Sequence, residues 1–158
     1  MQLTKNAIYA ATLLATIAAA VPSPAAGAEK FFLSNGEKSV MVEIEPSAAN
    51  TANVFQALAE GDIDCKGSAF CERLGSSCDA ARRKVIPSNT YTTSLGSADT
   101  GTCSGTCGLF VSGENCQASG EDLINAYNDI RSKGHCTHCG RKQMARGCMI
   151  KIDRVTGC

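Results

Sequence analysis

Several kinds of residue and motif are scarce or missing in this sequence. Its 158 residues include no tryptophan, five phenylalanines and three tyrosines, and basic and acidic residues balance to a formal net charge of zero. Few aromatic side chains and no excess of positive charge argue against a nucleic-acid-binding protein. No Asn-x-Ser/Thr sequence is present, so N-glycosylation is not expected. No nucleophile-elbow motif or separate carboxylate pair stands out, and we expect neither enzymatic activity nor a cofactor.

Cysteine is absent from the first part of the chain and frequent in the rest. All ten cysteines lie between Cys65 and Cys158. An even number at this density indicates five disulfides, which form and persist in oxidising, extracellular environments. The residues alone leave the pairing open. The cysteines are Cys65, Cys71, Cys78, Cys103, Cys107, Cys116, Cys136, Cys139, Cys148 and Cys158.

A long apolar run occurs only near the N-terminus. Residues 1–28 combine the positive charge of Lys5 with an apolar stretch at 7–21 and small residues after it, which is typical of a secretory signal peptide. The stretch is too short for a membrane-spanning helix. We therefore expect a secreted, extracellular protein whose mature chain begins at Glu29, and a retained N-terminal anchor is the alternative.

Residues 29–61 differ in charge from the residues that follow. They carry two lysines and five glutamates, a net charge of −3, whereas residues 62–158 carry twelve basic and ten acidic residues, a net charge of +2. Apolar alternation around Asn35-Gly36 predicts a β-hairpin, and residues 48–60 predict a helix. This acidic extension either packs permanently on the following domain or is a pro-segment that covers a basic surface. It contains no dibasic cleavage site, which favours a permanent extension.

Residues 62–158 form the expected disulfide-stapled domain. The stretch at 87–106 is rich in serine, threonine and glycine, which predicts a long exposed loop. Apolar residues at 108–111 predict a short strand. Residues 147–155 predict a final strand with isoleucines on one face and Asp153 on the other, polar face.

The clearest helix signal in the chain begins at Ser119. Ser119 and Asp122 have the spacing of a capping box, and apolar residues then recur at the spacing of one helix face. Basic residues and Gly134 follow, which predicts the end of the helix there. Cys136 and Cys139 come directly afterwards, so the helix delivers two sulfur atoms to one place.

The sequence HCTHC at 135–139 also permits a metal-binding interpretation. Two cysteines at this spacing are half of a zinc site, and Cys103 and Cys107 are the pair that could complete it. The apparent signal peptide and the even cysteine count favour disulfides instead. We therefore expect no bound metal, and a zinc-binding or redox protein remains the alternative.

Basic residues occur in two groups that are candidates for contact with a target. One group is Arg82, Arg83 and Lys84, and the other includes Arg141 and Lys142. Charge runs most often form a solvated face. On a rigid disulfide scaffold, however, a cationic group can bind an anionic membrane surface or the mouth of an ion channel.

Four cysteine-bearing segments resemble, in the same order, those of a known family. The segments DIDCKGSAFC at 62–71, CGLFVSGENC at 107–116, GHCTHCG at 134–140 and the terminal MIKIDRVTGC are similar to fungal killer toxins of the KP-four type. The resemblance implies an α+β fold, namely a small disulfide-rich α/β sandwich with an antiparallel sheet covered by helices. It also implies the disulfides Cys65–Cys136 and Cys71–Cys139.

The same resemblance implies a function. Such a protein is a secreted toxin that inhibits growth of competing or host cells, by blocking calcium channels through a basic residue, and the run at 82–84 is the nearest match. We accordingly expect a monomer whose partner is a membrane protein or cell-surface target of a susceptible cell, for example an ion channel. The alternative is an extracellular effector or inhibitor module that binds a secreted or surface protein through the loop at 87–106.

Overall fold

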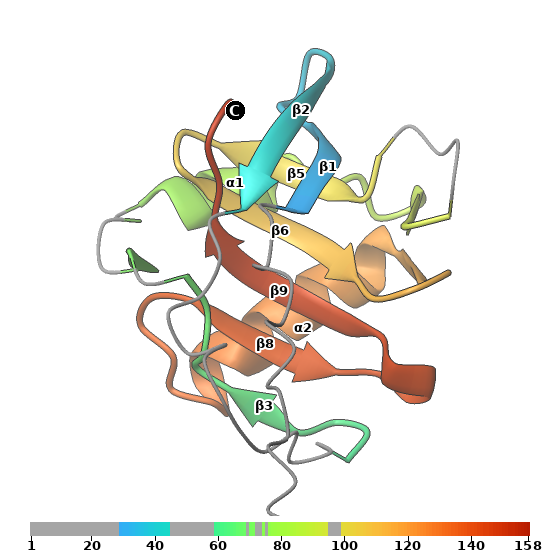
Figure 1. The fold of residues 1–158 in the computed structure, drawn as a ribbon. Coiled ribbons are helices and arrows are strands. Elements are labelled where there is room, and N and C mark those ends of the chain that lie inside the picture. Colours follow the sequence, from blue (N-terminus) through green and yellow to red (C-terminus); the bar gives the residue numbers. More distant parts are fainter. Residues whose placement is uncertain (1–28, 45–58, 69, 72–73, 75, 95–98) are drawn as a thin grey trace, which may run out of the picture.

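The computed structural model describes residues 29–44, 59–68, 70–71, 74, 76–94 and 99–158. The predicted signal peptide lies outside these residues, and so does the predicted helix at 48–60 apart from residues 59 and 60. Figure 1 shows the arrangement of the elements. In chain order they are β1 (Glu29–Ser34), β2 (Ser39–Ile44), β3 (Ile63–Asp64), α1 (Ser77–Arg83), β4 (Thr90–Thr92), β5 (Gly101–Ser104), β6 (Cys107–Ser112), β7 (Gln117–Ser119), α2 (Gly120–Ser132), β8 (Gly140–Gln143), η3 (Ala145–Gly147) and β9 (Met149–Arg154).

The main sheet is mixed, and this corrects the expected fold class. It has seven strands in the order β2-β1-β5-β6-β9-β8-β3, and β1 runs parallel to β5. In the described part of the chain only two α-helices accompany it. The expectation of an antiparallel sheet covered by helices is therefore wrong. It failed because residues 29–44 were assigned to an extension, whereas they supply two strands of the main sheet.

The region expected to be a long exposed loop contains two strands. Within 87–106, β4 pairs with β7 in a second, two-stranded sheet, and β5 joins the main sheet. Thr102 and Cys103 are fully buried. Small polar residues such as Thr102 therefore face the interior, while residues 87–90 at the beginning of the stretch are exposed.

The predicted hairpin around Asn35-Gly36 is confirmed. β1 and β2 pair in antiparallel register from Glu29 opposite Ile44 to Ser34 opposite Ser39. The Asn35 side-chain oxygen accepts the main-chain N–H groups of the two residues before β2, at 3.0 and 3.1 Å. Gly36 has a φ of 95°, a conformation that glycine adopts without steric cost.

The capping box at the start of α2 is also confirmed. The Ser119 hydroxyl accepts the N–H of Asp122 at 3.1 Å, and the Asp122 carboxylate accepts the N–H of Ser119 at 3.0 Å. The helix ends where predicted, with Lys133 as its C-cap and Gly134 directly after it. The residue with a left-handed conformation, however, is His135, with a φ of 53°, rather than Gly134. Gly134 is required for space instead: a Cβ there would lie 2.5 Å from the Ile63 side chain.

The two faces of the main sheet bury different clusters. On one face, Leu109 and Val111 of β6 pack in a cluster that includes buried residues from both helices. Figure 1 shows α2 crossing the sheet behind β6, β9 and β8. Phe110, between them in the sequence, belongs to a second cluster with residues from the hairpin and the C-terminal segment. The alternation of a β-strand thus divides the interior into two cores.

The sheet curls until its β2 edge meets the chain that follows β9. Glu43 and Thr156 exchange two main-chain hydrogen bonds, of 3.1 and 3.0 Å. Figure 1 shows the C-terminal segment running beside β2. The hairpin is therefore in contact with β5 on one side and with residue 156 on the other, and it closes over Phe110.

Candidate functional site

Two disulfides fasten the end of α2 to the segment around β3. Cys65 is bonded to Cys136 and Cys71 to Cys139, with S–S distances of 2.00 and 1.93 Å. These are the two pairs that the resemblance implied. Arg131, in the last turn of α2, donates hydrogen bonds to the carbonyl oxygens of Cys136 and His138, at 2.6 and 2.5 Å. Through Arg131, the helix therefore holds both Cys136 and the loop between Cys136 and Cys139 in place.

The remaining six cysteines also form disulfides, so that no cysteine is free. The zinc alternative required thiolates from Cys136, Cys139, Cys103 and Cys107, and each of these sulfur atoms is already bonded to another. The two histidines beside the first pair are exposed. The three other disulfides are Cys78–Cys107, Cys103–Cys158 and Cys116–Cys148.

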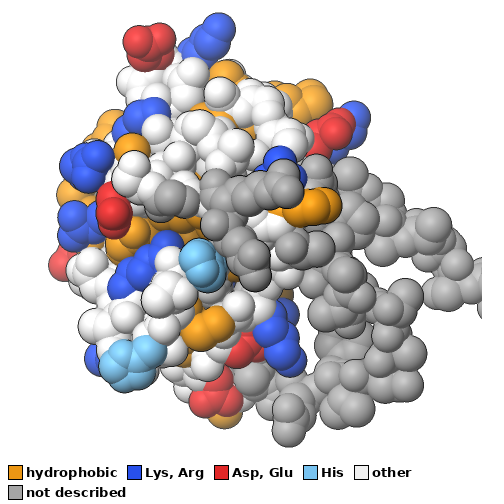
Figure 2. Space-filling model, turned by 90° about the vertical axis from the view of Figure 1, so that its left-hand side faces the viewer, with side chains coloured by type: hydrophobic (Ala, Val, Ile, Leu, Met, Phe, Trp, Pro, Cys, Tyr) orange, Lys and Arg blue, Asp and Glu red, His pale blue; other side chains and the backbone are white. Residues whose placement is uncertain are grey.

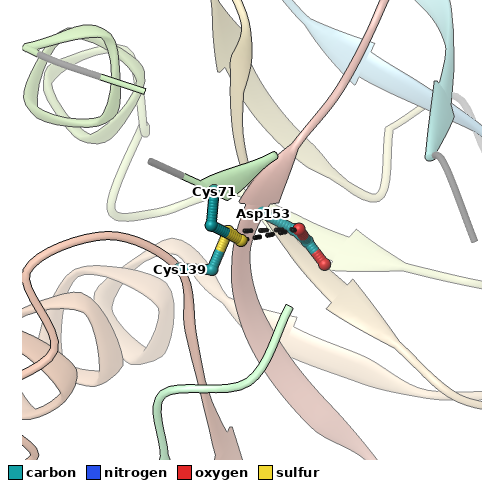
Figure 3. A group of neighbouring side chains, drawn as sticks. All are labelled: Cys71, Cys139 and Asp153. Atoms are coloured by element: carbon teal, nitrogen blue, oxygen red, sulfur yellow. Dashed lines mark hydrogen bonds between the residues drawn. A yellow bond between two sulfur atoms is a disulfide. The ribbon is translucent and has the colours of Figure 1, made fainter. Parts of the chain in front are cut away.

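A buried carboxylate lies against one of these disulfides. Asp153 Oδ1 is 3.2 Å from Cys139 Sγ and 3.8 Å from Cys71 Sγ, as the dashed lines in Figure 3 mark. Because both sulfur atoms belong to a disulfide, neither carries a proton to donate. The donors to Oδ1 are the main-chain N–H groups of Ser68 and Arg154, both at 2.8 Å. Asp153 therefore joins β9 to the loop that carries Cys71.

The environment of Asp153 opposes ionisation. Burial raises the pKa of its carboxyl, while the N–H donors of Ser68 and Arg154, followed by the charges of Lys151 and Arg141, act in the opposite direction. The side chain is only 5% exposed. The sequence predicted Asp153 on the face of the last strand opposite Ile150 and Ile152, but it did not predict that this side chain is buried. The loop that covers it is distant in sequence, and no local pattern signals the contact.

The side chains of Cys71, Cys139 and Asp153 have potential metal-ligand atoms within 4.8 Å of one another. Two of these atoms are the bonded sulfurs of Cys71 and Cys139. A disulfide sulfur has no negative charge to offer, so the group does not fit a metal ion in its oxidised form. The arrangement supports a structural role for Asp153 in holding the loop.

The first group of predicted contact residues lies in and after α1. Arg83 is exposed, and Arg82 and Lys84 are partly buried. The Lys84 ammonium group donates a hydrogen bond to the carbonyl oxygen of Cys103 at 3.1 Å. A Cβ built on Gly36 would lie 3.4 Å from the Lys84 side chain, so the turn of the hairpin rests on its aliphatic part. Lys84 is thus occupied within the fold, and Arg83 remains directed to solvent.

The second group, on β8, is held in ion pairs. Arg141 binds Asp64 of β3 through two guanidinium nitrogens. Lys142 lies 2.6 Å and Lys133 2.8 Å from the carboxylate of Asp129 in α2. Hydrogen bonds from Lys133 and then from Lys142 lower the pKa of Asp129. These contacts tie β8 to the edge strand β3 and to α2.

The structure does not unite the two groups into one site. α1 packs on β5 and β6, whereas β8 lies beyond β9 in the sheet. In Figure 2, lysine and arginine side chains appear at separate places on the face shown, with polar surface and hydrophobic side chains between them. Of the five predicted contact residues, Arg83 is the one that is exposed.

Fold and disulfides together define a small, disulfide-stapled protein dominated by β-structure, and five disulfides in a chain of this size are typical of extracellular proteins. Within the described residues, no helix combines the length and apolar character that crossing a membrane requires. The chain belongs to the meiotically up-regulated gene family, whose profile matches residues 63–158. Searches of curated proteins and of solved structures found no match.

Proposed function

We propose that this protein is a secreted toxin-like protein that inhibits the growth of competing or host cells by binding a target at their surface, without catalysis. The observation that carries the proposal is the pairing of all ten cysteines into five disulfides. Such cross-links restrict the unfolded chain and suit a protein that functions outside the cell. The signal-peptide pattern at 1–28 supports the same location.

The surface at the end of α1 is the part of the molecule that best suits contact with a target. Arg83 is exposed there, and Ile86, three residues on, is 52% exposed. A guanidinium group beside an apolar side chain is a common combination in protein interfaces. A membrane protein with an acidic outer surface, such as a calcium channel, is the partner class that the resemblance to killer toxins implies.

Growth assays with the oxidised protein, comprising residues 29–158, test this function. Arg83→Glu should raise the concentration required for inhibition about tenfold or more, because one charge reversal at a binding surface costs at least about 1.4 kcal/mol. Lys66→Glu, a charge reversal at another exposed basic residue, is the matched control and should leave the inhibition unchanged. The proposal is contradicted if the oxidised protein inhibits the growth of no member of a broad panel of fungi and plants.

A second candidate function is that of an inhibitor or effector module that binds a secreted protein. The observation that favours it is the continuous exposure of residues 86–90, which lead from the segment after α1 to the first residue of β4. Such a segment on a rigid scaffold can enter a concave site of a partner. Pull-down from secreted extracts distinguishes the two: recovery of a soluble partner supports the module, and recovery of membrane components supports the toxin.

A further inference from the structure

The hairpin formed by β1 and β2 is joined to the rest of the fold without a disulfide. No cysteine precedes Cys65, so the hairpin has none. The family match begins at residue 63 and leaves the hairpin out. By contrast, β5, β6 and the C-terminus each carry a cross-linked cysteine. Non-covalent contacts alone therefore hold the hairpin in the main sheet.

These contacts bury an apolar face that belongs to the hairpin. Leu33 of β1 and Val42 of β2 are fully buried in the cluster around Phe110. Phe31 packs its ring 5.4 Å from that of Phe110. The opposite face of the hairpin carries Phe32 and is open to solvent, where Phe32 is 46% exposed. One face of the hairpin thus packs into the hydrophobic cluster around Phe110, and the other face makes no contact with that cluster.

The site that receives this face also offers two main-chain edges. β5 pairs with β1 in parallel, with Leu33 opposite Gly101, and the Thr100 N–H donates to the carbonyl oxygen of Phe32 at 2.8 Å. Thr156 pairs with Glu43 on the other side. An apolar site between two hydrogen-bonding edges is suited to extended polypeptide and binds it by strand addition.

We propose that β5, Phe110 and the segment after β9 form a strand-acceptor site that can take the hairpin of a second copy of this chain in place of its own. The hairpin of a second copy fits this site because it would make the same contacts that the protein's own hairpin makes there. Fourteen residues, 45–58, separate the hairpin from the next described residue. When extended they span about 45–50 Å, several times the roughly 13 Å radius of gyration of a domain this size.

Exchange is expected to depend strongly on concentration. The two arrangements have the same contacts, so the intramolecular one is favoured at low concentration, because its hairpin is always close to the site. At high concentration the hairpins of neighbouring molecules compete. Reciprocal exchange between two copies gives a closed dimer, which dilution alone reverses slowly because each hairpin must first leave its site.

Two full-length versions of the protein test the proposal. One carries a tag before the hairpin and the other a different tag after Cys158, and both contain an engineered protease site within residues 45–58. The two are mixed in equal amounts at high concentration, incubated, diluted and cut, and the second tag is captured. Complete exchange should place the foreign hairpin on about half of the captured domains. Absence of foreign hairpin after prolonged incubation overturns the proposal.

Matched variants of the tagged hairpin distinguish specific docking from adhesion. Leu33→Ala, carried by both versions, removes a fully buried side chain and weakens the hairpin equally in its own and in a foreign site, so the final extent of transfer should not change. Because each hairpin must first leave its site, the exchange should instead become about 30-fold faster or more. Phe32→Ala, on the exposed face of the same strand, should transfer like the unaltered hairpin. Equal exchange rates for the two variants contradict an acceptor site. None of these readouts depends on growth inhibition, so the result is independent of the proposed function.

Discussion

Arg141 holds Asp64 in a two-pronged ion pair between β8 and β3. Its Nε lies 2.9 Å from Oδ1, and its Nη2 lies 2.8 Å from Oδ2. The two side chains are 27% and 18% exposed, so the pair is less screened by water than most surface pairs. β3 has only two residues and forms the edge of the sheet, and this contact supplements its short ladder.

Arg141→Ala and Asp64→Ala should each lower the free energy of unfolding by about 1–3 kcal/mol, as expected for charged hydrogen bonds. Because each removes the same interaction, the double variant should lose less than the sum. Denaturant unfolding with the disulfides intact measures all four proteins. Strictly additive losses contradict the pairing. If Arg141 also contacts a target, Arg141→Ala alone will reduce growth inhibition further than Asp64→Ala does.

Asp153 should tolerate asparagine far better than alanine. Asparagine keeps an oxygen that can accept the N–H groups of Ser68 and Arg154, whereas alanine leaves both without their partner. We expect Asp153→Ala to lower the free energy of unfolding at neutral pH by about 2–4 kcal/mol, and Asp153→Asn by less than half of that. Equal losses for both variants would show that the oxygen is not what holds the loop.

Asp153 also predicts a pH dependence with a definite sign. Burial raises its folded-state pKa above the unfolded value of about 3.9, so the folded protein binds this proton more tightly. The resulting stabilisation is fully present below the unfolded pKa and is lost as the pH rises through the folded pKa. The unfolding free energy of the natural protein, minus that of Asp153→Asn, should therefore decrease from about pH 3 and then level off. Urea unfolding across that range measures it, and a rising difference contradicts the assignment.

Features set by neighbouring residues were predictable from the sequence. The Asn35-Gly36 turn and the capping box of Ser119 and Asp122 depend on contacts within four residues, and both are present. The final strand was also predicted, and β9 spans Met149–Arg154. Such signals locate elements, because turn and cap chemistry acts locally.

Features set by distant pairing were not predictable. The parallel contact of β1 with β5 joins Leu33 to Gly101, and the burial of Asp153 depends on Ser68, far away in the sequence. Pairing of strands across such separations leaves no periodic signal in either segment. The exposure of the basic residues Arg141 and Lys142 could not be predicted for the same reason. It depends on their ion pairs with Asp64 and Asp129, which lie in other elements.

Tyr127→Phe tests the contact between the two helices. The Tyr127 hydroxyl donates a hydrogen bond of 2.5 Å to Asp79 in the first turn of α1. Phenylalanine retains the ring in the core and removes only this bond, so the free energy of unfolding should fall by about 1–2 kcal/mol. Thermal unfolding should show a correspondingly lower midpoint. Tyr127→Phe with unchanged stability would mean that the bond contributes nothing net.

Gly67 should be the least replaceable residue of the loop that covers the Cys71–Cys139 disulfide. A Cβ at this position would lie 2.4 Å from Cys139 Cβ and 2.9 Å from Cys71 Sγ, closer than side-chain atoms approach one another. Gly67→Ala therefore forces the loop away from the disulfide and should lower the free energy of unfolding by about 2 kcal/mol or more. It should also reduce the yield of the Cys71–Cys139 bond during oxidative refolding, which peptide mapping measures. Lys66→Ala, next to it and exposed, is the matched control and should refold and unfold like the natural protein. If Gly67→Ala behaves like this control, the loop does not lie against the disulfide.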